Sequence, residues 1–128
     1  MRPELTLLLW SVALTFAQAM LAVCGGIEQV GLPRLAGNRD NLPVFAGWAG
    51  RAQRAHRNML ESLVLFACVV LIAVIAGRTD RITLLGAQLF FWARLAYAVI
   101  YLIGIPWLRT LVWGVAVAGI VMIFLQVI

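Results

Sequence analysis

Long apolar runs separated by short polar segments dominate the pattern along the chain. Residues 5–27, 62–77 and 110–128 contain no charged side chain, and Arg94 is the one charge within residues 82–108. A helix that crosses the hydrocarbon core of a bilayer needs about 20 mostly apolar residues. The second run reaches this length by including the residues before Ser62. The runs lack the alternation of lipid-facing barrel strands, so we predict spanning helices.

The pattern therefore predicts an all-α integral membrane four-helix bundle that forms one domain over residues 1–128. The expected helices cover about residues 5–27, 52–77, 81–104 and 107–128. The segment 28–50 is rich in glycine, proline and asparagine, which predicts a long loop. Thr79 or Asp80 is expected to cap the third helix, and Pro106 suits the first turn of the fourth.

Composition narrows the class of protein further. The chain is 64% hydrophobic and 12% charged, with a mean hydropathy of +1.01. Soluble domains are about half apolar and about a quarter charged. A chain of 128 residues has too little interior to bury so many apolar side chains, which excludes an ordinary soluble domain. Cys24 and Cys68 lie in different predicted helices, and we interpret both as small packing residues rather than a disulfide.

All ten basic residues are arginine, and they give a net charge of +5. They lie between or inside apolar runs, so no water-facing basic domain is left for nucleic acid. One side of the predicted bundle holds Arg34, Arg39, Arg51, Arg54, Arg57 and Arg109, and the other holds Arg2, Arg78 and Arg81. This bias predicts a cytoplasmic long loop and both termini outside the cytoplasm.

The first apolar run has an alternative interpretation as a cleaved signal peptide. Ala17-Gln18-Ala19 has the small-x-small form of a cleavage site. Glu4 in the leader, and the continuation of the apolar run beyond these residues, favour a helix that stays in the protein.

Two stripes of polar residues interrupt the apolar helices. Arg51, Arg54, Asn58 and Glu61 share one face of the second helix, and Arg94, Tyr97 and Tyr101 share one face of the third. At 1.5 Å per residue, Glu61 lies about 24 Å from the outer end of its helix, and Arg94 lies about 18 Å from that end of its own. Both stripes are thus expected at one level in the inner half of the membrane. Arg109 and Thr110 begin the fourth helix beside this level.

Structural roles are the alternative for some of these residues. Arg57 and His56 fit side chains that reach from the apolar zone to the interface, and Arg94 and Glu61 fit a buried ion pair. His56 has no second ligand residue nearby, so we predict no metal site. The gathering of ionisable groups at one depth favours a functional site.

The chemistry of the cluster indicates its ligand. Several arginines with one carboxylate suit a small molecule that carries both carboxylates and an amine. A guanidinium or hydroxyl group beside a thiol favours the reactive thiolate. The chain offers no cysteine there, so the thiol is expected to arrive with the ligand. The apolar helix surfaces give a hydrophobic second substrate access from the membrane lipids.

The segment Arg54–Glu61, RAHRNMLE, resembles the R-A-x-x-N-x-x-E signature of the MAPEG family, the membrane-associated proteins in eicosanoid and glutathione metabolism. Residues 37–43 and 47–52 look like the bacterial branch of the family, which implies a bacterial inner membrane. The similarity extends over residues 93–101 to Pro106 and Arg109, so it covers essentially the whole chain.

The resemblance implies a homotrimer with glutathione bound between subunits near the cytoplasmic face. Arg109 matches the arginine that stabilises the glutathione thiolate, and Thr110 holds the neighbouring hydroxyl position. The residues that match glutathione contacts are Arg54, Asn58, Glu61, Arg94, Tyr97 and Tyr101, with Arg51 a weaker addition. Glu61 is expected to hold the amino group of glutathione.

Departures from the family pattern concern the substrate more than the fold. Val64 and Leu65 stand where many members have a proline, Tyr97 where some have histidine, and Trp113 where some have tyrosine. The leading hypothesis is a glutathione-dependent transferase or peroxidase. The alternatives are a non-catalytic membrane module that binds another anion or lipid, and a four-helix exporter, for which the first helix lacks a central ionisable residue.

Overall fold

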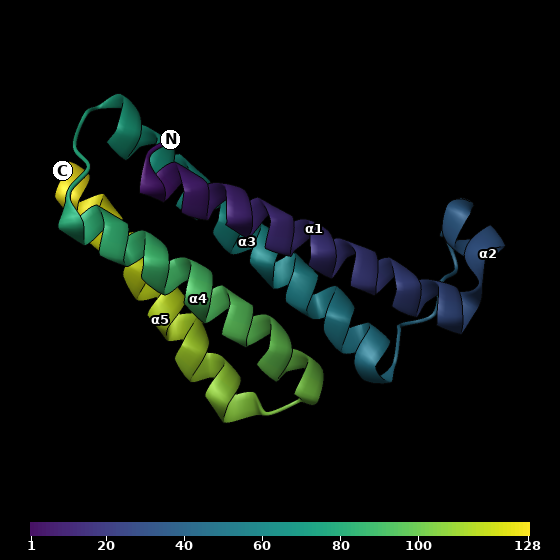
Figure 1. Ribbon diagram of the computed structural model, residues 1–128. Coiled ribbons are helices and arrows are strands. Elements are labelled where there is room, and N and C mark those ends of the chain that lie inside the picture. Colours follow the sequence, from purple (N-terminus) through teal and green to yellow (C-terminus); the bar gives the residue numbers. More distant parts are fainter.

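The computed structural model describes residues 1–128 and contains helices only (Figure 1). The helices are α1 (Pro3–Val30), α2 (Leu32–Ala36), α3 (Gly47–Ile75), α4 (Arg81–Ile103) and α5 (Pro106–Val127). All except the short α2 are long and apolar enough to cross a membrane. The predicted all-α four-helix membrane architecture is therefore confirmed.

The predicted boundaries are wrong around the long loop. The segment 28–50 holds the last turn of α1, the whole of α2 and the first turn of α3. Gln29 fixes this region: its Nε2 donates to the Ala46 carbonyl at 2.6 Å, and its Oε1 accepts from the Ala46 N–H at 3.0 Å. Leu35 and Phe45 pack with Ala49 in a small apolar cluster beneath α2. These long-range contacts override the local turn signals.

The two ends of α4 are set as the sequence predicts. Asp80 caps the helix, because its Oδ1 accepts from the backbone N–H groups of Ile82 and Thr83, both at 2.9 Å. Thr83 Oγ1 accepts in return from the Asp80 N–H at 2.8 Å, which completes a capping box. At the other end Gly104, with φ 93°, closes α4, and Pro106 begins α5.

The long helices run roughly along one direction (Figure 1). The N- and C-termini lie at the end where α3 turns into α4, and α2 lies at the opposite end. Helix α4 packs against α1, α3 and α5. Phe66 of α3 and Phe90 of α4 stack in the core with ring centroids 4.0 Å apart, and both are fully buried. Large apolar side chains cover much of the outer surface, as membrane lipids require.

Two glycines allow α4 and α5 to touch backbone to backbone. A Cβ on Gly119 would lie 2.4 Å from the carbonyl oxygen of Gly86, and a Cβ on Gly86 would lie 2.6 Å from that of Gly119. No ordinary side chain fits at either place without moving the helices apart. Small residues at such crossings are typical of membrane helices, whose association depends on close packing.

Helix α1 carries its polar residues on the buried side. Its buried non-glycine residues are Glu4, Ser11, Thr15 and Gln18, whereas apolar residues such as Trp10 and Phe16 are exposed. The spacing keeps these polar residues on one stripe that faces α3 and α4. This arrangement is inverted relative to a soluble bundle, because lipid rather than water surrounds the helix.

The glycine contact generates a stability prediction. Replacement of Gly119 by alanine (Gly119→Ala) should destabilise the protein by ~1–3 kcal/mol, because the new methyl group meets backbone atoms that cannot yield without parting α4 and α5. Gly114→Ala on the same helix is the control, since a Cβ there meets nothing within 4 Å. Thermal unfolding of the purified protein in detergent should show a lower Tm for Gly119→Ala alone. Equal Tm values for both variants would contradict the proposed close contact.

Candidate functional site

A polar pocket lies between α3, α4 and α5. It has a volume of about 280 Å³, and its lining residues are Arg54, Asn58, Tyr97, Tyr101, Arg109, Thr110 and Trp113. The structure therefore brings together most of the residues that the sequence selected, from three separate helices.

Hydrogen bonds show that the two polar stripes meet at one level. Arg54 Nε of α3 donates to the Tyr101 hydroxyl of α4 at 3.1 Å. One turn further into the bundle, Arg94 Nη1 of α4 donates to Asn58 Oδ1 of α3 at 2.8 Å. The antiparallel helices thus pair Arg54 with Tyr101 and Asn58 with Arg94, which sets the register of the pocket.

Tyr101 lies between the two arginines of the pocket. The guanidinium carbon of Arg109 is 4.6 Å from the centroid of the Tyr101 ring, and that of Arg54 is 5.9 Å from it. The Tyr97 ring packs beside it, with centroids 5.5 Å apart. Aromatic rings attract cations over their faces, so Tyr101 holds two positive groups near each other.

The electrostatics of the pocket favour an anion. Arg54 and Arg109 both contribute a guanidinium group, and no acidic side chain lines the pocket. Asn58, Thr110 and the tyrosines add neutral hydrogen-bonding groups. Two cations placed together without a counter-charge repel each other, and a bound carboxylate or thiolate relieves that repulsion.

Arg94 supports the pocket from behind rather than lining it. The residue is fully buried. Its Nε donates to the Met59 sulfur at 3.3 Å, and its guanidinium carbon lies 4.1 Å from the Tyr97 ring centroid. Its Nη2 makes no hydrogen bond. The alternative of an ion pair between Arg94 and Glu61 is not realised: the Arg94 guanidinium contacts the Asn58 amide and the Tyr97 ring instead.

Two further predicted site residues, Glu61 and Arg51, lie outside the polar pocket. Glu61 is exposed on α3, with no hydrogen bond or ion pair. It lies three residues beyond Asn58, at the edge of the polar stripe that turns away from α4. Arg51 donates from Nε to the Leu102 carbonyl at 3.0 Å, and so binds the C-terminal end of α4. The depth of both residues follows from the sequence, but their direction around the helix axis does not.

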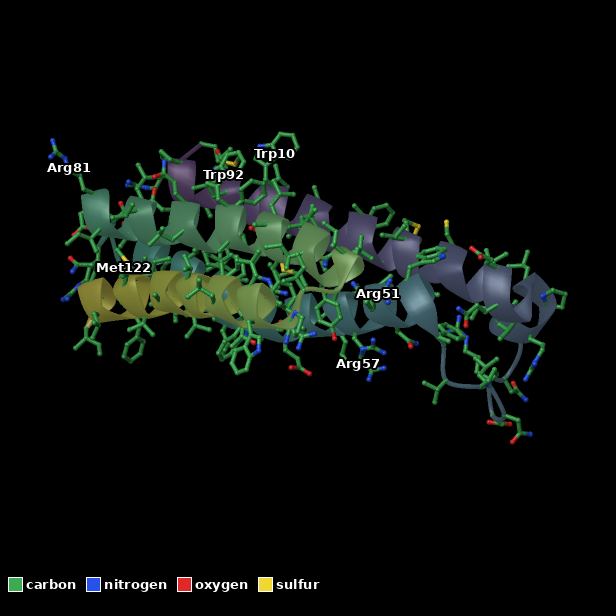
Figure 2. All side chains as sticks on the ribbon, turned by 90° about the horizontal axis from the view of Figure 1, so that it is seen from below. Trp10, Arg51, Arg57, Arg81, Trp92 and Met122 are labelled. Atoms are coloured by element: carbon green, nitrogen blue, oxygen red, sulfur yellow. The ribbon has the colours of Figure 1, made fainter.

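Figure 2 shows how the arginines of α3 differ in direction. Arg57 projects outward from the bundle, and Arg51 lies close to the end of α4 (Figure 2). Arg57 is exposed and makes no hydrogen bond, in agreement with an interfacial side chain. Cys24 and Cys68 are unpaired and exposed on α1 and α3, away from the pocket.

Trp113 is the lining residue that the sequence did not select as a site residue. Trp113 lies four residues after Arg109 and three after Thr110, so the three side chains share one face of α5. Their helical spacing is the sequence signal that places Trp113 in the pocket.

The architecture and the pocket define a class: a multi-pass membrane protein with an arginine-containing polar pocket between its spanning helices. A family model identifies it more closely, because the model of the MAPEG family matches residues 5–128. The chain belongs to the MAPEG family. No curated protein and no solved structure shows a significant match to the chain.

Removing the partner of Arg94 should destabilise the protein. Asn58→Leu leaves Nη1 of a fully buried guanidinium without its acceptor. Hydrogen bonds to charged groups contribute about 1.5–3 kcal/mol, so the free energy of unfolding should fall by that amount. Gln53→Leu on the same helix is the matched control, because that amide makes no hydrogen bond. A Tm for Asn58→Leu equal to that of the control would show that Asn58 does not hold Arg94.

Proposed function

We propose that the protein is a glutathione-dependent membrane transferase or peroxidase that acts on hydrophobic electrophiles. The observation that carries the proposal is the convergence of Arg54 and Arg109 on Tyr101 in a pocket that no acidic residue lines. Membership of the MAPEG family supports the same conclusion, since the family is associated with glutathione metabolism.

The pocket offers a group for each part of glutathione that carries charge. Arg54 uses only its Nε for Tyr101, so both Nη groups remain to donate to a carboxylate as a fork. Asn58 uses its Oδ1 for Arg94, and its Nδ2 stays available as a donor. The side chains are thus held in place before the ligand arrives, which lowers the entropic cost of binding.

Arg109 and Thr110 are the proposed catalytic residues. They lie at positions four and five of α5, close to its N-terminal end, where the helix dipole also favours negative charge. Arg109 stabilises the thiolate of glutathione. The Thr110 hydroxyl donates to the Pro106 carbonyl at 3.3 Å, a long bond that it can exchange for one to sulfur.

The thiolate then reacts with the second substrate. In a transfer reaction the sulfur forms a bond to the electrophilic carbon, and the leaving group departs with its electron pair. In a peroxidase reaction a hydroperoxide is reduced to an alcohol and water, while two glutathione molecules are oxidised to their disulfide. Trp113 lines the pocket and is exposed, so a hydrophobic substrate would reach the pocket from the lipid beside this side chain.

Glu61 supports a site shared between subunits of a homotrimer. An exposed carboxylate in an apolar zone is costly unless a partner meets it. The ammonium group of glutathione, bound between subunits, would supply that partner. The volume of about 280 Å³ is at the lower limit for a ligand pocket, which fits a site that a neighbouring subunit completes.

The predicted orientation places this pocket near the cytoplasmic face of a bacterial inner membrane. Cysteines introduced at Asn38 and at Thr79, each in a chain without Cys24 and Cys68, test it. A membrane-impermeant maleimide applied to whole cells should label Thr79→Cys, because both termini and the 76–80 turn lie outside. It should label Asn38→Cys only after the cells are lysed. The reverse pattern would invert the proposed topology.

Binding of glutathione tests the proposed function. Arg54→Gln should weaken binding about 10- to 150-fold, the equivalent of about 1.5–3 kcal/mol for a charged hydrogen bond. Arg57→Gln is the matched control, because Arg57 lies one turn along α3 and projects away from the pocket. Isothermal titration of the purified protein with glutathione provides the measurement. Absence of binding to the unmodified protein, or equal losses in both variants, would refute the proposal.

The same titration, followed by the ultraviolet absorbance of the thiolate, assigns the role of Arg109. Arg109→Met should bind glutathione but show less thiolate at neutral pH, because the cation that favours the ionised sulfur is gone. Thiolate formation unchanged in Arg109→Met would exclude Arg109 as the catalytic residue. Thiol binding without turnover of any hydrophobic electrophile would instead favour the non-catalytic membrane module.

A further inference from the structure

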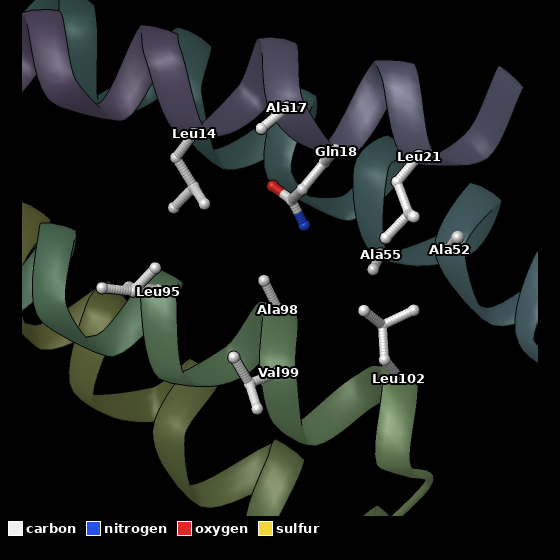
Figure 3. Close-up of a pocket in the computed structure, with 10 residues that line it drawn as sticks. All are labelled: Leu14, Ala17, Gln18, Leu21, Ala52, Ala55, Leu95, Ala98, Val99 and Leu102. Carbon is white, nitrogen blue, oxygen red and sulfur yellow. The ribbon is translucent and has the colours of Figure 1, made fainter. Parts of the chain in front are cut away.

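A second pocket lies on the other side of the α3–α4 pair, facing α1 (Figure 3). It has a volume of about 180 Å³, and all but one of its lining residues are hydrophobic. They are Leu14, Ala17, Leu21, Ala52, Ala55, Leu95, Ala98, Val99 and Leu102, and the exception is Gln18. We call this the α1 pocket. It shares no lining residue with the polar pocket.

Gln18 is buried in this apolar setting without a hydrogen bond. The residue is 7% exposed, and neither its Oε1 nor its Nε2 has a partner. Figure 3 shows the amide group projecting from α1 into the pocket. A buried amide without a partner costs about 1–3 kcal/mol, and the low dielectric of a membrane interior does not lessen this cost.

The neighbouring polar residues on the same stripe of α1 are satisfied. Ser11 and Thr15 each donate to the carbonyl four residues earlier, at 2.8 Å. Glu4 accepts from Thr83 Oγ1 at 2.9 Å. Gln18 is therefore the member of the stripe that lacks a protein partner, and it is also the member that lines a pocket.

We propose that the α1 pocket binds an apolar molecule that carries one neutral hydroxyl group, which bonds to the Gln18 amide. A single hydroxyl donates to Oε1 and accepts from Nε2, so it satisfies both ends of the amide. A charged group does not fit, because no ionisable side chain lines the pocket. A water molecule fits less well, since it makes the same two bonds to Gln18 but leaves its second O–H without an acceptor among the other, apolar lining residues.

The size and the rim of the pocket agree with this class of ligand. A dry apolar cavity of about 150 Å³ holds a molecule the size of benzene, so about 180 Å³ admits a slightly larger one. Ala17, Leu21 and Val99 at the rim are exposed, which opens the pocket toward lipid. A longer apolar tail would extend from the rim into the bilayer.

The α1 pocket is separate from the proposed glutathione site. Ala55 and Ala98 line the α1 pocket, whereas their neighbours Arg54 and Tyr97 line the polar pocket. The packed α3–α4 pair forms the wall between them. A ligand in the α1 pocket therefore contacts none of the residues that are proposed to hold glutathione, and its binding does not depend on catalysis.

Two probes of equal size separate hydrogen bonding from simple filling of the pocket. Benzyl alcohol and ethylbenzene differ by a hydroxyl in place of a methyl group. Each is titrated into ¹⁵N-labelled full-length protein in deuterated detergent micelles without glutathione. The side-chain amide resonances of Gln18 are identified by their loss in Gln18→Met. Benzyl alcohol should shift these resonances saturably, and ethylbenzene should do so only at higher concentrations, because it fills the pocket without bonding to the amide.

Gln18→Met and Gln88→Met form the matched pair of variants, because Gln88 is an exposed glutamine on α4 outside the α1 pocket. In Gln18→Met the affinity for benzyl alcohol should fall about tenfold, while that for ethylbenzene should not fall. The same variant without ligand should have a higher Tm, since it removes an unsatisfied amide. Gln88→Met should change neither affinity.

Two outcomes would overturn the proposal. The first is a Gln18 amide whose resonances do not respond to benzyl alcohol. The second is a Gln18→Met variant with a lower Tm and an altered oligomeric state, which would show that a second copy of the chain satisfies the amide. Loss of glutathione binding in the earlier experiment would leave this proposal unaffected.

Discussion

A fully buried guanidinium inside a membrane-spanning segment is the constraint on which the arrangement of α3 and α4 depends. Arg94 is always charged, and exposing it to lipid would cost several kcal/mol. Asn58 of α3 accepts from it and the Tyr97 ring of α4 covers it, so the bond to Asn58 fixes the register of α3 against α4. That register places Arg54 within hydrogen-bonding distance of Tyr101, and Tyr101 in turn fixes Arg109 of α5. The polar pocket is thus a consequence of how the buried charge is satisfied.

The α3–α4 pair presents two different environments on its two sides. Adjacent residues of a helix point about 100° apart, so Arg54 faces guanidinium and phenol groups while Ala55 faces an apolar cavity. Small side chains on the second side let α1 approach, and a Cβ on Gly25 of α1 would lie 2.6 Å from that of Ala49. The two arginines of the polar pocket thus lie on the side that α5 closes, while Gln18 is the one polar residue that lines the α1 pocket on the other side. This separation keeps a polar site and an apolar site apart in one small bundle.

Much of the fold could be predicted from the sequence, because hydrophobic length and capping residues are local signals. The level of the polar stripes was also predictable, since the rise per residue of a helix is constant. The direction of a side chain around the helix axis could not be predicted in the same way. Glu61 shows this, because it is exposed on α3 and does not contact Arg94. Opposite charge makes the Glu61 carboxylate an apparent partner for Arg94, whereas in the structure Arg94 contacts the Asn58 amide and the Tyr97 ring. The role of Gln29 likewise has no local sequence signal, because its hydrogen bonds to Ala46 span 17 residues.

Unsatisfied groups carry more information in a membrane protein than in a soluble one. At the surface of a soluble protein, water can replace a missing hydrogen-bond partner, whereas membrane lipid cannot. Helix α1 shows the consequence, because Ser11 and Thr15 bond to their own backbone, where no other group reaches them. Gln18 has a longer side chain that extends past its own helix, so it depends on another molecule instead. The same reasoning applies to Glu61, which is exposed on α3 without a hydrogen bond: a carboxylate in an apolar zone needs a partner, and the proposed function assigns that role to the ammonium group of glutathione.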